Sequence, residues 1–379
     1  MDADRPRVAV WRNAWLAGSE TFVRDQVAAM RRWEPVRFGL RAVAEPLTPA
    51  DRTLLGPSRH HELRLELTGS IGLRRRAAAF LRERQVRLVH AHFGLDATSA
   101  RPVAARLGVP LVATCHGYDV TKLTRLPPPM GWEYRRRLRQ AFDSAGALVA
   151  VSRFIAERMA ALGADPDRIR ILPIGIDTRG VRDTDPLPDP ARRRGVAFVG
   201  RLVPKKGVTE LLQTWGALPA SLRAQHPLRI VGEGPLHAEL AAAAAAVDGP
   251  VELLGYRSSA EVADVLARSA VYLQPSRTAA DGDAEGFGMV YLEAALQGLP
   301  SVAYAHGGVT DAVSDGVTGL LAPEGDHAAL HANLEQLLTD PALAGRLGAA
   351  GRHRVLTEFD VVTCTAALER LYDEVAGSR

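Results

Sequence analysis

Short apolar segments alternate with helix-like segments along this chain, and this alternation restricts the fold more than any other feature. Stretches such as 73–85 and 134–142 have helical periodicity. Between such stretches we predict short buried strands at residues 8–11, 88–92, 111–114, 148–151, 196–199, 228–231, 251–254, 271–274 and 301–304. The pattern predicts an α/β fold with two doubly wound parallel sheets, helices on both faces, and ligands at the carboxyl ends of the strands.

The length of the chain predicts two domains. It has 379 residues, 47% of them hydrophobic, which is more than a single core usually holds. The stretch 178–195 between the two halves is rich in Pro, Asp and Arg and has the composition of a linker. We therefore place one domain at 1–180 and the other at 192–359.

Composition excludes several classes of protein. The net charge of +4 is nearly balanced, which argues against a nucleic-acid partner and favours a small anionic ligand. The two cysteines, Cys115 and Cys364, lie far apart and lack the spacing of metal ligands. The first residues are charged, and no run of about 18 uncharged apolar residues occurs, so neither a signal peptide nor a spanning segment is predicted. We expect a cytoplasmic location.

Two carboxylates flank a predicted helix start at Glu285 and Glu293. The glycines of Glu285-Gly286-Phe287-Gly288 allow a ligand to approach the main chain, and a helix is predicted over 289–299. A phosphate can bind the free amides near Gly288 and Met289, helped by the helix dipole. The alternative is that Glu293 only complements the dipole and Glu285 is a solvated loop acid.

A second cluster is cationic. Lysine occurs only at positions 122, 205 and 206, and the last two lie in the loop Gly200-Arg201-Leu202-Val203-Pro204-Lys205-Lys206-Gly207 after a predicted strand. A diphosphate needs a bidentate fork and compact point charges, which Arg201 and Lys206 can supply. A solvated run of charge is the alternative.

Together these motifs resemble family 4 of the retaining glycosyltransferases with the GT-B fold, a family that includes sucrose synthase, phosphatidylinositol mannosyltransferases and many polysaccharide enzymes. The resemblance covers nearly the whole chain. In the second half it rests on the following elements: Gly200-Arg201-Leu202 with Lys205-Lys206-Gly207, Val231-Gly232-Glu233-Gly234-Pro235, Gln274-Pro275-Ser276, Glu285 to Glu293, and Gly307-Gly308 with Asp315-Gly316-Val317-Thr318-Gly319. In the first half Ser19-Glu20-Thr21-Phe22-Val23, His90-Ala91-His92-Phe93-Gly94 and His116-Gly117-Tyr118-Asp119 look like the exopolysaccharide or colanic-acid type.

The resemblance implies two Rossmann-like domains that face a cleft. The N-terminal domain would bind the acceptor and the C-terminal domain the nucleotide-sugar donor. The final residues, 360–379, would form a helix that packs back on the first domain.

Carried onto this sequence, the resemblance also implies roles for single residues. Arg201 and Lys206 would neutralise the donor diphosphate, Glu293 would bind the ribose and Glu285 would contact hydroxyls of the donor sugar. His116 would face the sugar from the first domain. The remaining donor contacts would come from backbone: the amides of Phe287, Gly288 and Met289, the base-binding segment at Gly255 and Tyr256, and the loop at Gly18. Many relatives carry a glycine pair in that last loop, where this chain has residues 12–18 without one.

Histidines and aspartates in the first half raise further candidates. His116 follows an apolar run at the carboxyl end of a predicted strand, and Asp119 would orient it or contact the acceptor. His92 is a weaker acceptor-binding candidate. His90 and His92 would share one strand face, but with no third ligand evident we predict no metal site. Asp281-Gly282-Asp283 mimics a metal-binding pair, yet it lies directly before Glu285, so we expect a metal-independent enzyme.

The predicted function is transfer of a sugar from a nucleoside diphosphate sugar, with UDP favoured, to an acceptor hydroxyl with retention of configuration. The departing phosphate can take the acceptor proton, so no dedicated base and no cofactor are expected. The alternatives are a sugar-nucleotide epimerase of the same fold, a non-catalytic binding module, and a Rossmann oxidoreductase, which would need a third glycine after Val231-Gly232-Glu233-Gly234.

The acceptor is left open. Polysaccharide or glycoconjugate biosynthesis is favoured, with a carbohydrate or lipid-linked acceptor, while a small-molecule acceptor such as an aminoglycoside is the alternative. The arginine triplets at 74–76 and 135–137 suggest peripheral contact with anionic lipid at the inner membrane face, or else a solvated helix face.

Overall fold

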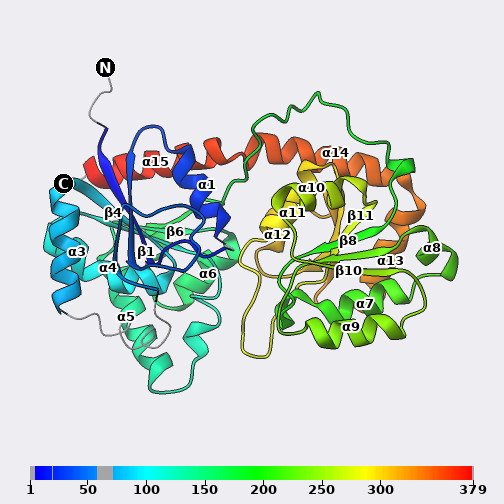
Figure 1. Ribbon diagram of the computed structural model, residues 1–379, viewed down its shortest axis with the longest axis horizontal. Coiled ribbons are helices and arrows are strands. Elements are labelled where there is room, and N and C mark those ends of the chain that lie inside the picture. The colour runs from blue at the N-terminus through cyan, green and yellow to red at the C-terminus, as the bar shows by residue number, and fades with distance from the viewer. Residues whose placement is uncertain (1–4, 19, 58–70, 378–379) are drawn as a thin grey trace. The chain divides into compact units, whose positions relative to one another are not determined.

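The computed structural model describes residues 5–18, 20–57 and 71–377, and the chain divides into two compact units (Figure 1). The N-terminal unit contains Met1–Asp177 and Val361–Arg379, and the C-terminal unit contains Thr178–Asp360. The described residues include no helix long and apolar enough to cross a membrane.

A seven-stranded sheet forms the centre of the N-terminal unit, with strand order β3-β2-β1-β4-β5-β6-β7 and parallel pairing throughout. Its strands are β1 (Arg7–Ala14), β2 (Glu34–Arg41), β3 (Arg52–Leu55), β4 (Val86–His92), β5 (Leu111–Cys115), β6 (Ala147–Ala150) and β7 (Ile169–Ile171). The central strands are nearly continuous runs of buried residues, as expected for a parallel sheet covered on both faces.

Helices connect these strands and cover the sheet (Figure 1). They are α1 (Thr21–Ala29), α3 (Ile71–Glu83), α4 (Gly94–Leu107), η1 (Leu123–Arg125), α5 (Met130–Ser144), α6 (Arg153–Ala161), η2 (Pro166–Arg168) and the C-terminal α15 (Val361–Gly377). The hydroxyl of Ser152 caps α6 by accepting from the amide of Ile155, 3.2 Å away.

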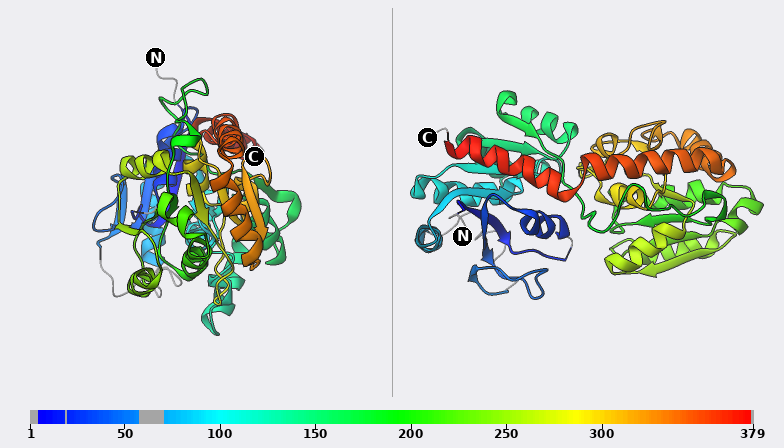
Figure 2. Two further views of the ribbon diagram at one scale, coloured as in Figure 1. Left: turned by 90° about the vertical axis from the view of Figure 1, so that its right-hand side faces the viewer. Right: turned by 90° about the horizontal axis from the view of Figure 1, so that it is seen from above.

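The chain returns to the N-terminal unit through α15, which lies along this unit in red in Figure 2. Glu369, almost fully buried, accepts hydrogen bonds from the amides of Arg31, Arg32 and Trp33 at 2.8–3.0 Å. The Tyr372 hydroxyl lies 2.6 Å from Nδ1 of His90 on β4. Helix α15 is therefore fastened to both the α1–β2 connection and the sheet.

The C-terminal unit contains a six-stranded parallel sheet with strand order β10-β9-β8-β11-β12-β13. Its strands are β8 (Val196–Val199), β9 (Leu228–Val231), β10 (Val251–Gly255), β11 (Val271–Gln274), β12 (Ser301–Ala305) and β13 (Gly319–Pro323). In both units the chain order reverses beside the first strand of the unit, which is the pattern of doubly wound folds.

The helices of the C-terminal unit bury one large apolar cluster around Phe198, Trp215 and Leu334. They are η3 (Pro190–Arg192), η4 (Pro204–Lys206), α7 (Val208–Gly216), α8 (Ala220–Gln225), α9 (His237–Ala246), α10 (Ser259–Arg268), α11 (Met289–Leu296), α12 (Val309–Ala312), α13 (His327–Thr339) and α14 (Pro341–Glu358). The predicted α/β class with two parallel sheets is confirmed.

Candidate functional site

Chemistry-bearing residues of the C-terminal unit gather in loops at the carboxyl ends of its strands. Lys206 lies in the loop after β8, Ser276 follows β11, Glu285 precedes α11 and His306 follows β12. We call these four residues the Glu285 cluster. Gly307, with φ of +52°, allows two of the loops to meet, because a Cβ there would lie 2.5 Å from the carbonyl oxygen of Glu285.

Glu285 and Lys206 form a largely buried ion pair. Nζ of Lys206 lies 2.5 Å from Oε2 of Glu285, and their side chains are only 13% and 11% exposed. Burial alone would raise the pKa of Glu285, but the charges of Lys206 and Lys205 outweigh it and lower the pKa to about 2. Glu285 is therefore a carboxylate at neutral pH, with Lys206 Nζ held against one of its oxygens.

A histidine and a second glutamate form a chain of hydrogen bonds that begins at the backbone amide of Glu285. The amide of Glu285 donates to Nε2 of His306 at 3.4 Å, so Nδ1 carries the ring hydrogen and faces Oε2 of Glu324 at 3.0 Å. The other oxygen of Glu324 accepts from the amide of Thr278 at 2.6 Å. Sequence reasoning missed His306 and Glu324, although the Gly307-Gly308 pair directly after His306 was a usable signal.

Helix α11 begins beside this pair. Gly288 is its N-cap with φ of +94°, and a Cβ at this position would lie 2.5 Å from the ring of Tyr291. The first amides of a helix have no acceptor within the helix, and the dipole makes this end favourable for an anion. Phe287 is buried against Phe359, with ring centroids 5.6 Å apart. The backbone at the start of α11 is thus fixed by packing.

Glu293 lies within α11, half-buried, and acts on the same surroundings as Glu285. Burial raises the pKa of the Tyr272 hydroxyl, and the charges of Glu293 and Glu285 raise it further. Tyr272 in turn donates to Oε1 of Gln274 at 2.6 Å, and Gln274 donates to Ser276 at 2.9 Å. Both predicted carboxylates therefore belong to one region of the unit.

Arg201 differs from Lys206 in its surroundings. Its side chain is exposed, and within the described ranges no carboxylate pairs with it. The preceding residue, Gly200, would place a Cβ 3.6 Å from Cε of Lys206, so the two predicted phosphate-binding cations extend from one short loop.

Gly255 ends β10 with φ of +65°, and Tyr256 after it is 75% exposed, which leaves that ring open to a ligand.

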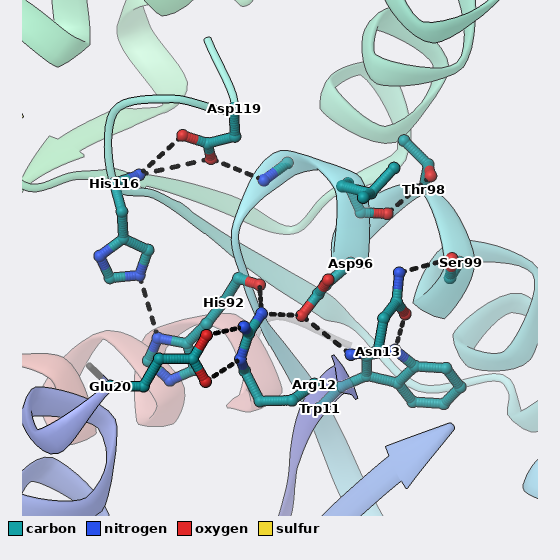
Figure 3. A network of polar contacts seen from close by, with 12 residues as sticks. Trp11, Arg12, Asn13, Glu20, His92, Asp96, Thr98, Ser99, His116 and Asp119 are labelled. Carbon is teal, nitrogen blue, oxygen red and sulfur yellow. Dashed lines mark hydrogen bonds and ion pairs between the residues drawn. The ribbon is translucent and has the colours of Figure 1, made fainter. Parts of the chain in front are cut away.

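A second polar cluster lies in the N-terminal unit around Arg12 (Figure 3). Arg12, on β1, is almost fully buried and pairs with the carboxylates of Glu20 and Asp96. It also donates to the carbonyl oxygen of His92 at 3.1 Å, and its guanidinium stacks over the Phe93 ring at 4.4 Å. Burial lowers the pKa of Arg12, but the two carboxylates outweigh it, so the net pKa is raised.

His116 and His92 contact each other beside Arg12. Nδ1 of His92 lies 3.2 Å from Nε2 of His116, and the rings of Phe22 and Phe93 pack on His116 with centroids 4.9 and 4.4 Å away. Burial, reinforced by the charge of Arg12, lowers the pKa of both histidines well below the ordinary value. Both rings are therefore neutral at pH 7, and one must donate to the other.

Asp119 has a structural role. Its side chain is fully buried, and its carboxylate accepts from the amides of Gly94 at 2.7 Å, Gly117 at 2.8 Å and His116 at 3.2 Å. Asp119 thus fixes the turn that carries His116, which agrees with the orienting role among its two predicted roles. The side chains of Asp119 and His92 are both buried, and contact of either with an acceptor stays a prediction. Gly18 is exposed with open space around it, and Ser19 lies outside the described residues.

The pair that mimics a metal motif is occupied by protein contacts. Asp283 pairs with Lys205 at 3.1 Å, and Asp281 accepts from the amide of Asp283 at 3.0 Å. In the part of the chain that the structure describes, no three His, Cys, Asp or Glu side chains are grouped as a metal ion would require.

Comparison with known proteins identifies the class. A family model described as Glycosyltransferase Family 4 matches residues 16–179, and one described as Glycosyl transferases group 1 matches residues 184–354. The solved structure of Anabaena Alr3699/HepE in complex with UDP and glucose superposes with a TM-score of 0.76, covering 98% of this chain and 100% of that one at 18% identity. The two units thus form the GT-B fold, with one Rossmann-like sheet in each.

Sequence relatives give the family. The chain is 34% identical over 289 residues to the GDP-mannose-dependent alpha-(1-6)-phosphatidylinositol monomannoside mannosyltransferase of Mycolicibacterium smegmatis, covering 71% of this chain and 72% of the relative. It is 30% identical over 271 residues to the amylovoran biosynthesis glycosyltransferase AmsK of Erwinia amylovora, covering 70% of this chain and 64% of that one. The chain therefore belongs to the group 1, family 4 glycosyltransferases, and the resemblance inferred from its motifs is confirmed.

Proposed function

We propose that this glycosyltransferase transfers a sugar from a nucleoside diphosphate sugar to an acceptor hydroxyl with retention of anomeric configuration. One observation carries the proposal: the buried Lys206–Glu285 pair lies beside the amino end of α11, and exposed Arg201 extends from the same loop as Lys206. A fork, a point charge and a helix end are the three devices that proteins use for phosphate groups.

Each candidate residue is assigned to one part of the nucleotide-sugar donor. Arg201 and the first amides of α11 bind phosphate oxygens, and Lys206 turns one hydrogen toward them while Glu285 keeps another. Glu285 accepts from donor-sugar hydroxyls with its remaining lone pairs, which its low pKa makes available at any physiological pH. Glu293 binds the ribose, the backbone at Gly255 and Tyr256 carries the base, and the loop at Gly18 adds a donor contact.

The reaction needs little from side chains beyond charge stabilisation. The bond between the anomeric carbon and the phosphate oxygen breaks, and the acceptor oxygen bonds to the same face of that carbon. The acceptor proton passes to the departing phosphate oxygen, so no side-chain base is required. Fixed donors aimed at the developing charge supply the main rate enhancement. His116 is neutral and acts as a hydrogen-bonding partner of the sugar, with no cofactor and no metal ion taking part.

The names of related proteins point to two different nucleotides, UDP and GDP, as the carrier of the donor sugar. A UDP-linked sugar stays our prediction, in keeping with the UDP bound to HepE, and GDP-mannose is the competing donor because the mycobacterial relative is named for it. The names AmsK and phosphatidylinositol monomannoside mannosyltransferase support an acceptor in polysaccharide or glycolipid biosynthesis. Such an acceptor is lipid-linked or carbohydrate, and a lipid-linked one would be reached by peripheral contact with a membrane.

A panel of nucleotide sugars tests the donor without knowledge of the acceptor. The purified protein is scored for slow donor hydrolysis and for thermal shift with UDP, GDP, ADP and dTDP sugars. We expect one base to give both a stabilising shift and release of free sugar, and anomer analysis of a transfer product to show retention. Absence of any shift at millimolar concentrations of all donors would contradict the proposal, and conversion of the donor into an epimer would replace it with an epimerase.

A further inference from the structure

An apolar tip projects from the N-terminal unit at the start of α5, which lies at the lower edge of this unit in Figure 1. Met130 and Trp132, in the first turn of α5, are 41% and 60% exposed. The other four tryptophans of the chain, at positions 11, 15, 33 and 215, are at most 2% exposed. A soluble surface rarely leaves so large an aromatic ring in water without a partner for it.

Basic residues flank this tip in the sequence. Between residues 122 and 139 the chain has six basic side chains and one acid, a net charge of +5. Five of the six basic side chains, those of Lys122, Arg125, Arg135, Arg136 and Arg139, are exposed, and Arg137 is half-buried. The single acid, Glu133, is bonded by Arg136 at 2.8 Å and by Arg137 at 2.5 Å. This local excess is larger than the net charge of the whole chain, +4, and residues 74–87 carry a second excess of the same size.

The tip has a fixed shape. The amide of Gly131 donates to the carbonyl oxygen of Pro127 at 3.1 Å, and Arg135 donates to the carbonyl oxygen of Thr124. From the next turn of α5, the Tyr134 hydroxyl donates at 2.7 Å to the carbonyl oxygen of Asp119, the residue that fixes the His116 turn. The exposed ring is thus displayed from a rigid support that continues directly into the candidate site of this unit.

We propose that Met130, Trp132 and the exposed cations around them, together the Trp132 surface, dock the N-terminal unit on an anionic phospholipid bilayer. Tryptophan is preferred at the membrane interface, and clustered Lys and Arg are attracted to anionic headgroups. The charge of the surface is opposite in sign to such a bilayer, and its apolar side chains form a small projecting tip, which suits insertion between headgroups. This inference rests on the proposed function only in that docking would bring a lipid-linked acceptor to the His116 turn.

Vesicle partitioning of the full chain tests the proposal. We compare vesicles of phosphatidylglycerol and phosphatidylcholine with vesicles of phosphatidylcholine alone, for the wild type, Trp132→Ser and Arg125→Glu/Arg136→Glu. The matched control is Arg192→Glu/Arg346→Glu, which makes the same charge change at exposed positions of the C-terminal unit. The wild type and the control should bind anionic vesicles equally, and both surface variants should bind at least about tenfold more weakly.

The fluorescence of Trp132 gives a second measure of vesicle binding. Anionic vesicles should shift the tryptophan emission to shorter wavelength, and this shift should vanish in Trp132→Ser and in high salt. Equal partitioning of all four proteins would overturn the proposal, as would binding that ignores the lipid charge. A Trp132-dependent shift with a soluble anionic polysaccharide but not with vesicles would assign the surface to a polymer instead. Retained donor hydrolysis in every variant separates these outcomes from failure of the proposed function.

Discussion

At the scale of single residues, one loop places two cations in different surroundings. Lys206 is held by Glu285, whereas Arg201 is exposed without a carboxylate partner among the described residues. Lys205, between them in the sequence, turns away to Asp283 and to the carbonyl oxygen of Ala284. The loop therefore offers two charges to a ligand and uses the third to fasten itself.

This difference predicts the effect of removing each cation. Arg201→Ala and Lys206→Ala should each lower turnover by a factor on the order of 10² or more, the loss typical of one charge-stabilising donor. Lys205→Ala, the matched control, should stay within about tenfold of the wild type because its ammonium already serves Asp283. Steady-state kinetics on the donor decide the matter, and near-wild-type turnover in both Arg201→Ala and Lys206→Ala would refute the assigned roles.

His306 predicts a second effect at this scale. His306→Ala removes the acceptor of the Glu285 amide and leaves a buried hydrogen-bonding group unsatisfied, which should cost about 1–3 kcal/mol of unfolding free energy. Turnover should fall as well, because Glu285 loses its support. His306→Gln can present an oxygen to the same amide and should recover part of both losses. Urea unfolding and kinetics of the pair measure this, and identical behaviour of the Ala and Gln variants would argue against the supporting role.

The sequence was informative about some site residues and silent about others for a physical reason. Arg201, Lys206, Glu285 and Glu293 lie in short motifs whose residue types suit a phosphate or a sugar. His306 and Glu324 act through contacts between segments 18 to 21 positions apart, so the only local signal was the Gly307-Gly308 pair that marks the loop of His306. The burial of Asp119 was likewise unpredictable, because it depends on amides contributed by a neighbouring connection.

At the scale of elements, most inner strands were predictable, whereas of the four edge strands only β10 was predicted. The predictions for β8, β9 and β11 match the structure residue for residue, since apolar residues dominate these short strands. Strands β2, β3, β7 and β13 were missed because they carry prolines, glycines or charges; β3, β7 and β13 are edge strands, which tolerate such residues, and β2 lies next to one. Helix α11 ends at Leu296 instead of the predicted 299, because Gly298 takes φ of +64° and cannot continue the helix.

The buried histidines of β4, and His116 directly after β5, should make the stability of the N-terminal unit sensitive to acid. Burial lowers the pKa of His90 to about 3 and those of His92 and His116 well below 6.5, so the folded state resists protons that the unfolded chain accepts. Stability from these histidines is therefore complete above about pH 6.5 and is lost as the pH falls. Near pH 5 His90 should contribute a slope of about 1.4 kcal/mol per pH unit, and His92 and His116 should add to the slope in the same direction.

Urea unfolding between pH 7.5 and 5 measures this slope. His90→Gln should reduce the slope by about 1.4 kcal/mol per pH unit, whatever it does to stability at pH 7.5. Stability of the N-terminal unit that is flat between pH 7 and pH 5 would mean that the three histidines are protonated in the folded state.

At the scale of the whole molecule, the alternating pattern and the motif order together predicted the two-sheet fold that the structure and its GT-B neighbours confirm. The course of α15 was implied by family resemblance rather than by any local pattern. Its attachment depends on Glu369, a buried acid whose three amide donors lie more than 330 positions away in the sequence. No helical periodicity reveals such a partner.

Metal independence is a prediction about the enzyme as a whole. If Arg201 and Lys206 supply the positive charge, turnover should survive exhaustive treatment with a chelator within about twofold, since charge stabilisation comes from fixed side chains. The measurement is initial rate after chelation and again after addition of manganese or magnesium. Loss of activity that manganese restores would show that a cation holds the diphosphate.

The C-terminal unit should bind a diphosphate through its fixed charges, which comparative calorimetry can measure. Binding of UDP against UMP, and of GDP against GMP, is measured for the wild type and for Arg201→Ala/Lys206→Ala. For the base that the protein accepts, the diphosphate should bind at least about tenfold more tightly than the monophosphate, and the ratio should fall toward one in the double variant. A wild-type ratio near one, or a ratio that the double variant leaves unchanged, would contradict the account.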